Sequence, residues 1–393
     1  MKILHRPKTS LKLVTTLGLT AGIVAACTGL GPGAGSSSTS PSDSARPTSP
    51  FDPTMATPPP TGPLLAYRAA DELGLVDGTE VIATAPGAIG ASNDLLLTED
   101  GRFLFARTTD DKVVTLDVHS GEAATREVSV GPVLGTDGAA TIVWFEQPNR
   151  LMQLDLRDPD SQPVLRQEVD LPPTTPGRQA EPRLVVARGG TAVIARVEAA
   201  PSPYGGPDTL YAVRGPGPPT PLGQADANSP VSVARLSPDG SELAYALYRS
   251  TDSTCGTAAV VLSGADGSQE TFDVAGPGNG SGSGSKVPKL WWPPTGPPKL
   301  SLATWRCDRP ETYSPLVWQL PTGANGAAGS IEQLTPPTSA LQTADVAPGQ
   351  RALLLPETGA YTEPTGTLVL EESGRRISIK NGVDAIAVIR PSP

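Results

Sequence analysis

The sequence predicts an all-β chain that folds as a six-bladed β-propeller, with seven blades left open, behind an N-terminal export segment. The chain of 393 residues contains 42 Gly and 44 Pro, and both residue types disfavour helices. Short apolar runs such as Phe103-Leu104-Phe105 and Ile142-Val143-Trp144-Phe145 have the composition of strands and are bounded by Gly, Asp or Pro. A turn centred on Gly recurs between such runs about every 37 to 56 residues, which is typical of propeller blades.

Residues 1–26 are predicted to be a lipoprotein signal peptide. The start of the chain is basic, and the apolar run at 13–24 is shorter than the roughly 20 residues that a membrane-spanning helix needs. This run ends in Val24-Ala25-Ala26-Cys27, which resembles the lipobox of bacterial lipoproteins. The resemblance implies cleavage before Cys27 and acylation of that residue, including palmitate-type chains, at the extracytoplasmic face of the cell membrane. The alternative is an ordinary secretory signal with an incidental Cys.

The segment at 27–63 is predicted to be a lipid-anchored, disordered linker. It consists mostly of Ser, Thr, Pro, Gly and Ala and offers little apolar surface to bury. The whole chain has a formal net charge of −10. Cleavage before Cys27 would remove four basic residues and make the remaining chain more acidic. An acidic body disfavours nucleic acid and anionic lipid as partners, so we expect membrane contact only through the lipid anchor.

The propeller is predicted to occupy residues 64–393. Its Gly-centred turns each join two apolar strands, because a tight hairpin needs a residue with positive φ. The glycines at the centres of these turns are Gly101, Gly138, Gly190, Gly240, Gly296 and Gly349. Six turns indicate six blades, with 64–90 and 377–389 supplying the strands that close the ring. Seven blades remain possible, because the terminal strands are hard to apportion.

Two of these repeats carry a family resemblance. Leu236-Ser237-Pro238-Asp239-Gly240, continued to Tyr245, is similar to the blade motif of TolB-like, WD-type propellers, and so is the stretch at 97–106 with its continuation at 114–122. The resemblance covers two blades well and the others weakly. It implies the fold and says little about activity, because such propellers host many functions. It also implies a binding site on the face opposite the Gly turns.

Long polar loops are expected on that opposite face, after the second strand of several blades. They are predicted at 199–208, 249–256, 306–314 and 356–365, and long loops on a rigid scaffold often carry binding residues. Tyr, Trp and Arg are enriched where proteins bind one another. The predicted partner-binding residues are Tyr204, Arg249, Asp252, Trp305, Arg306, Asp308, Arg309, Tyr313 and Tyr361. In the alternative, the aromatic residues cover blade edges and the charges merely solvate the loops.

Cys255 and Cys307 are predicted to form a disulfide. With Cys27 acylated they are the two remaining cysteines of an exported chain, and the repeat places them on the same face of neighbouring blades. The alternative is a pair of free, buried thiols.

Catalytic chemistry has little support in the sequence. His119 is the only histidine left after cleavage, and its position between two outer strands indicates an exposed turn rather than a catalytic base. We therefore expect a monomeric, non-enzymatic interaction platform without a cofactor. Its partner would be an envelope protein, such as a membrane sensor or secretion component, or secondly a cell-wall glycan. The alternative is a central funnel that binds or cleaves a glycan or small ligand, with Ca²⁺ held by polar residues before the inner strands: Asn93, Asp94, Asp226, Asn228 and Asp345.

Overall fold

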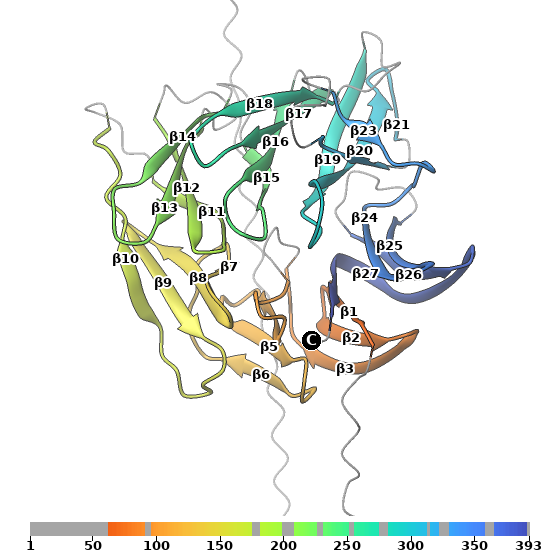
Figure 1. Cartoon of the computed structure of the whole chain (residues 1–393), viewed down its shortest axis with the longest axis horizontal. Coiled ribbons are helices and arrows are strands. Elements are labelled where there is room, and N and C mark those ends of the chain that lie inside the picture. The colour runs from red at the N-terminus through yellow and green to blue at the C-terminus, as the bar shows by residue number, and fades with distance from the viewer. Residues whose placement is uncertain are drawn as a thin grey trace, which may run out of the picture. The chain divides into compact units, whose positions relative to one another are not determined.

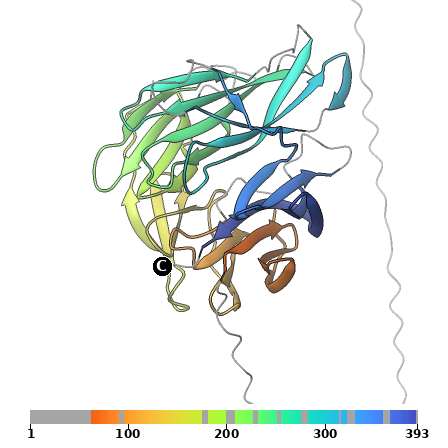
Figure 2. The ribbon, with the colours of Figure 1, turned by 45° about the vertical axis from the view of Figure 1, so that its right-hand side comes forward.

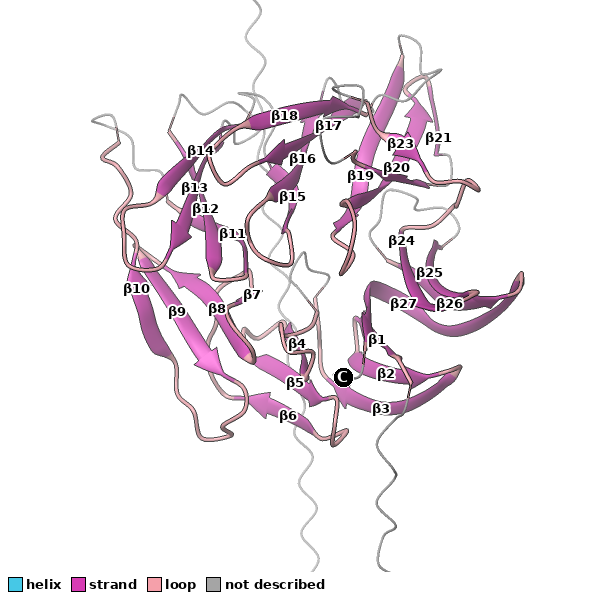
Figure 3. Cartoon of the chain, in the orientation of Figure 1, coloured by secondary structure: helices cyan, strands magenta, loops and turns pink. Residues whose placement is uncertain are grey.

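The structure is a computed structural model of the whole chain, and every regular element that it describes is a β-strand (Figure 3). It describes residues 62–90, 96–174, 181–198, 208–225, 231–250, 255–274, 282–312, 315–321, 330–357 and 365–390. The chain divides into the units Met1–Thr57 and Pro58–Pro393, and all described residues belong to the second. The predicted signal peptide, Cys27 and nearly all of the predicted linker therefore lie outside the described residues. None of the described segments is a helix long and apolar enough to cross a membrane.

Three blades in the middle of the chain are complete four-stranded antiparallel sheets. Blade 3 contains β7 (Gly135–Thr136), β8 (Thr141–Glu146), β9 (Arg150–Asp155) and β10 (Val164–Glu168). Blade 4 contains β11 (Arg183–Arg188), β12 (Thr191–Val197), β13 (Asp208–Arg214) and β14 (Thr220–Gln224). Blade 5 contains β15 (Val231–Leu236), β16 (Leu243–Ser250), β17 (Gly256–Ser263) and β18 (Gln269–Asp273).

Two further blades depart slightly from this pattern. Blade 2 contains β4 (Phe103–Arg107), β5 (Val113–Asp117) and β6 (Ala123–Arg126), and an isolated bridge between Leu97 and Leu104 takes the place of its inner strand. Blade 6 contains β19 (Ser283–Trp291), β20 (Lys299–Arg306), β22 (Leu316–Gln319) and β23 (Glu332–Gln333), with β21 (Arg309–Thr312) also paired to β20.

One long strand joins the remaining two blades. Blade 7 contains β24 (Gln342–Ala347), β25 (Gln350–Pro356), β26 (Gly366–Glu372) and the first half of β27 (Arg375–Ile389). The second half of β27 pairs instead with β1 (Leu64–Ala69), with Ile389 opposite Leu64, Val383 opposite Ala69 and a register shift between Arg68 and Ala69. It thus becomes the inner strand of blade 1, which continues with β2 (Glu72–Asp77) and β3 (Glu80–Pro86). The N-terminal strands accordingly lie beside the C-terminal ones (Figures 1 and 2).

The described strands thus form seven blades, the second of the two numbers that the sequence allowed. The six glycine turns mark blades 2 to 7, because each turn joins an inner strand to the next strand along the chain. Blade 1 has no such turn, since its inner strand comes from the opposite end of the chain. All six predicted turn glycines have positive φ, between 68° at Gly240 and 92° at Gly296, so the turn prediction is confirmed.

The core of the molecule lies between the blades. Most buried apolar side chains of the described residues belong to seven clusters, and each cluster joins two consecutive blades. Trp144 of blade 3, for example, packs with Phe103 and Phe105 of blade 2. The cluster with Leu65 and Leu354 joins blade 1 to blade 7, which completes the circle. Each sheet is buried on both faces because it has a neighbour on both sides, and this packing defines a closed β-propeller.

Candidate functional site

The cysteines form a bridge between blades 5 and 6. Cys255 precedes β17 and Cys307 follows β20, and a disulfide joins them with their Cα atoms 5.2 Å apart. The backbone N–H of Cys307 also donates to the carbonyl oxygen of Gly282 at 2.8 Å. A cross-link of this kind typically contributes about 2–4 kcal/mol by restricting the unfolded chain. It ties the loop that follows β16 to the loop that follows β20.

Charged side chains are exposed next to this bridge. Arg306 donates from Nε to Oδ1 of Asp308 at 3.0 Å and from its second terminal nitrogen to Oδ2 at 2.8 Å. The side chains remain 57% and 60% exposed. Arg249, near the end of β16, is exposed as well. We refer to Arg249, Cys255, Arg306, Cys307 and Asp308 as the clamped edge.

Trp305 packs inside the sheet and is only 7% exposed. It stands opposite Gly284 of β19, where an added Cβ would lie 2.3 Å from an atom of the indole ring. The ring therefore fills the hollow that the glycine leaves on the neighbouring strand. Because the ring is covered, we remove Trp305 from the partner-binding set and assign it to packing.

Four of the predicted partner-binding residues, Tyr204, Asp252, Tyr313 and Tyr361, lie outside the described residues. The backbone of Arg309 pairs with Arg306 through β21, while its side chain is outside what the structure describes.

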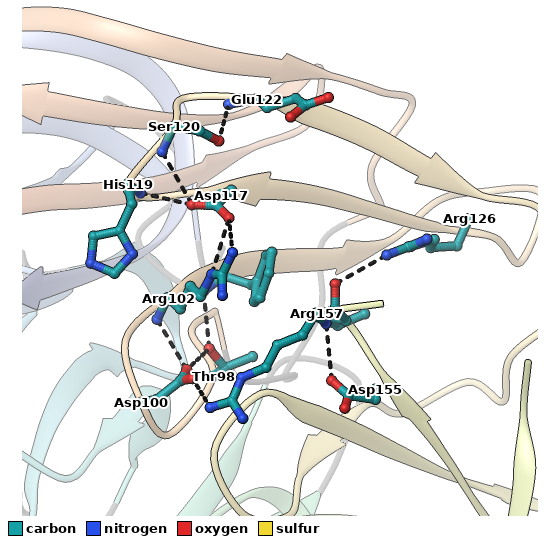
Figure 4. Close-up of polar contacts among 12 residues, drawn as sticks. Thr98, Asp100, Arg102, Asp117, His119, Ser120, Glu122, Arg126, Asp155 and Arg157 are labelled. Atoms are coloured by element: carbon teal, nitrogen blue, oxygen red, sulfur yellow. Dashed lines mark hydrogen bonds and ion pairs between the residues drawn. The ribbon is translucent and has the colours of Figure 1, made fainter. Parts of the chain in front are cut away.

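The opposite face holds the glycine turns, where polar side chains tie neighbouring blades together. Asp100 accepts hydrogen bonds from the Thr98 hydroxyl at 2.7 Å, from the backbone N–H of Arg102 at 3.1 Å and from the Arg157 guanidinium at 2.9 Å (Figure 4). Burial raises the pKa of Asp100, but these hydrogen bonds outweigh it and hold the pKa below its usual value. Glu99 reaches further, because its Oε1 accepts from the Gly189 N–H of blade 4 at 2.7 Å. The charges on this face therefore hold blades together.

His119 lies in the turn between β5 and β6 and is exposed, as the sequence predicted. Its backbone N–H donates to Oδ1 of Asp117 at 2.8 Å, while Oδ2 of Asp117 accepts from Arg102 at 3.1 Å (Figure 4). Within the described segments, no three His, Cys, Asp or Glu side chains converge as metal ligands. Of the polar residues expected at the funnel, Asp345 is exposed on β24, and Asn93, Asp94, Asp226 and Asn228 lie outside the described residues.

A second group of charges, which sequence reasoning missed, gathers around the inner strands. Arg68 of β1 and Asp384 of β27 form a buried ion pair, with Nε of Arg68 2.7 Å from Oδ1 of Asp384 and their side chains 1% and 4% exposed. Lys289 of β19 is 5% exposed. Burial is the main cause that lowers the pKa of Lys289 to about 7, with Asp384 opposing the shift and Arg68 and Arg235 of β15 adding to it. We call Arg68, Arg235, Lys289 and Asp384 the axial cluster.

The axial cluster lies near the central axis of the ring. Lys289 belongs to blade 6, and it interacts electrostatically with residues of blade 1 and of blade 5. Blade 7 separates blade 6 from blade 1 around the ring, so groups of those two blades approach each other only near the axis. The run at 283–291 gave no signal for this arrangement, because the charges that face Lys289 come from strands more than fifty residues away in the sequence.

Three solved structures are similar to this chain. An oligogalacturonate lyase from Vibrio parahaemolyticus is 12% identical, with 81% of this chain and 79% of that chain covered and a TM-score of 0.47. The β-propeller domain of Cps50 (Swd1) from Myceliophteria thermophila is 14% identical, with 75% and 91% covered and a TM-score of 0.44. A chain assigned as a TolB from Agrobacterium tumefaciens is 12% identical, with 69% and 88% covered and a TM-score of 0.40.

No protein-family model and no curated protein sequence matches the chain. Because the identities and TM-scores are low, the fold is assigned from the strands and the packing of this chain alone. By that measure the protein belongs to the β-propeller class. Within the class, the sequences of its repeats at Gly101 and Gly240 resemble the TolB-like blade motif.

Proposed function

We propose that this protein is an envelope lipoprotein whose propeller serves as an interaction platform outside the cytoplasmic membrane. Acyl chains on Cys27 would hold it there, since two or more chains give stable anchoring where one is marginal. The residues that end in Cys27 support export and lipidation. The bond between Cys255 and Cys307 supports the same location, because disulfides persist in oxidising compartments.

The observation that carries the platform proposal is the clamped edge. The exposed pair of Arg306 and Asp308 adds little to stability, because exposed ion pairs are typically worth about 0–1 kcal/mol. The disulfide nonetheless fixes the loop that carries this pair, which restricts its conformations before a partner arrives. Such preorganisation lowers the entropic cost of binding. Arg306 and Arg249 would present positive charge to an acidic patch of the partner.

We propose binding rather than catalysis for this protein. His119, the single histidine of the mature chain, stands in an exposed hairpin, and its backbone N–H donates to Asp117. The proposed partner is an envelope protein, and a cell-wall glycan is the second choice. The acidic composition disfavours nucleic acid, and we propose a monomer.

The test is crosslinking capture from intact cells that carry the anchored protein. The double variant Arg249→Ala/Arg306→Ala should lose a specific captured envelope protein by at least about tenfold. Its melting temperature should stay close to that of the wild type, because both residues are exposed. The matched control is Arg376→Ala, which removes a similarly exposed Arg that pairs with Glu371 at 2.7 Å on an outer hairpin. Equal capture by the double variant and the control would remove the clamped edge from the binding site, and enrichment of wall glycan alone would favour the second partner.

A further inference from the structure

The junction between blades 6 and 7 has the smallest apolar cluster among the described residues. The cluster contains three buried side chains, Trp291 of β19, Val317 of β22 and Ala340, with Leu334 and Leu355 partly buried beside them. The clusters at the other six junctions each contain nine to thirteen buried side chains. Burial of apolar surface is the main force that holds two sheets together, so this junction is held less strongly than the others.

A buried hydrogen-bond donor weakens the same junction further. Trp291 is 8% exposed, and Nε1 of its indole ring has no hydrogen-bond partner among the described residues. A buried donor without an acceptor raises the free energy of the closed state, because the same group is hydrogen-bonded when it is in water. Opening of the junction returns this N–H to water and removes that penalty.

Stronger links lie on both sides of this junction. The disulfide between Cys255 and Cys307 ties blade 6 to blade 5, and the continuous strand β27 hydrogen-bonds blade 7 to blade 1. Across the junction, a terminal nitrogen of Arg351 on β25 donates to Oγ1 of Thr338 at 3.3 Å. Thr338 belongs to the edge of blade 6, because its carbonyl oxygen accepts from the Val317 N–H at 2.9 Å. Blades 5 and 6 therefore form one linked pair, and blades 7 and 1 form another.

The backbone passes from one pair to the other at a single peptide bond. The N–H of Ala340 donates to the carbonyl oxygen of Pro315 in blade 6 at 3.1 Å. The N–H of the next residue, Leu341, donates to the carbonyl oxygen of Leu354 in blade 7 at 2.7 Å. A rotation between Ala340 and Leu341 can therefore separate the two blades while both of these hydrogen bonds stay in place.

We propose that the ring opens locally between blades 6 and 7, with a hinge between Ala340 and Leu341. Local opening occurs where a fold buries little apolar surface, while the rest of the structure stays intact. The opening exposes Trp291 and Val317 to solvent, and the sheet of blades 7 and 1 moves as one unit. The clamped edge lies entirely on blades 5 and 6, so this proposal does not depend on the binding of a partner there.

The test labels a buried cysteine placed in the junction of the purified full-length chain, with its disulfide intact. Ala340→Cys puts a thiol at a position that is 0% exposed, so iodoacetamide reaches it only when the junction opens. Peptide mass spectrometry separates this label from any label on Cys27. The matched controls are Ala212→Cys between blades 4 and 5 and Ala246→Cys between blades 5 and 6, at positions that are 1% and 0% exposed.

The thiol of Ala340→Cys should react at least about tenfold faster than the thiols of both controls, because the controls react only through wider unfolding. Low concentrations of urea should accelerate the controls and leave the Ala340→Cys rate nearly unchanged, since a local opening exposes little surface. Equal rates in the three variants would overturn the proposal.

The wild type supplies a second measurement that no misfolded variant can disturb. N-bromosuccinimide oxidises accessible indoles, and Trp305 is a matched control because it is 7% exposed, as deeply buried as Trp291 at 8%. Trp291 should be oxidised at least about tenfold faster than Trp305, because Trp305 lies in the sheet beside Gly284 and away from the opening. Oxidation of the two indoles at the same rate would contradict an opening between blades 6 and 7.

Discussion

At the scale of single residues, the backbones of neighbouring blades meet at their turn glycines. Gly240 has φ +68°, and an added Cβ would lie 2.6 Å from the carbonyl oxygen of Arg188 in the preceding blade. Gly189 makes the reciprocal contact, since its added Cβ would lie 2.6 Å from the carbonyl carbon of Asp239. The Ser237-Pro238-Asp239-Gly240 motif therefore meets two needs at once, the positive φ of the turn and a close approach between blades 4 and 5.

These two needs can be separated by a pair of substitutions. Gly138 has φ +70°, nearly the same as Gly240, but an added Cβ there would meet no atom within 4 Å beyond its chain neighbours. Gly138→Ala should lower the free energy of unfolding by about 1–2 kcal/mol, because Ala is strained in the left-handed backbone conformation and meets no other obstacle. Gly240→Ala should cost roughly 1–3 kcal/mol more, because the blades must also move apart. Urea unfolding of the two variants would measure the difference, and equal losses of stability would contradict the contact between the blades.

Lys289 makes the stability of the protein depend on pH in a definite direction. Its pKa in the fold is about 7, and in the unfolded chain it should be near the usual value of about 10.4. Between these values the unfolded state binds more protons, so this residue makes stability rise with pH from about 7 to about 10. Below about pH 7 both states are protonated and the full cost of the buried charge is present.

Lys289→Met removes that dependence. The variant should exceed the wild type in unfolding free energy at about pH 6, by an amount on the order of a few kcal/mol, and the gap should narrow towards about pH 10. Chemical denaturation at the two pH values measures this. A constant gap would mean that the amine titrates normally in the fold.

At the scale of elements, the continuous strand β27 belongs to two blades. Its first half is the outer strand of blade 7, opposite β26, and its second half is the inner strand of blade 1, opposite β1. The change of partner occurs around Gly382, which has φ +68°, and Val383, which pairs with both neighbours. The two ends of the propeller are thereby hydrogen-bonded into one sheet.

Removal of residues 383–393 should therefore open the ring rather than trim an end. It deletes the inner strand of blade 1 and leaves apolar side chains of blades 1 and 2, such as Leu64 and Leu104, without Ile389 in their shared cluster. We expect loss of cooperative unfolding, measured by thermal denaturation. The control lacks only residues 391–393, which follow β27, and should unfold as the full chain does. A cooperative transition in the longer truncation would show that the ring does not need this closure.

At the scale of the whole molecule, the predicted lipid on Cys27 would decide where the propeller acts. Cys27→Ser should abolish incorporation of labelled palmitate and release the protein from the membrane fraction, because an acidic propeller has little attraction for anionic lipid. The melting temperature should not change, since all described strands begin after Gly62. Membrane retention of the variant would point instead to a different attachment.

The sequence alone was enough for the class of fold and for much of its detail. Strand composition and turn glycines are local properties, so the β-propeller and the positive φ at Gly101 and Gly240 could be predicted from short stretches. The cysteines could be assigned to neighbouring blades because each lies at a similar position after the turn glycine of its own repeat. The predictions for Cys27 and for the residues of the clamped edge remain predictions.

The tertiary structure decided what depends on contacts between distant strands. It set the number of blades at seven within the described residues, because the inner strand of blade 1 comes from the other end of the chain. It covered Trp305, since Gly284 on the neighbouring strand leaves room for the ring. It also brought Arg68, Arg235, Lys289 and Asp384 towards one axis. These residues are far apart in the sequence. Their burial and their electrostatic interactions arise only when the folded ring brings distant strands together.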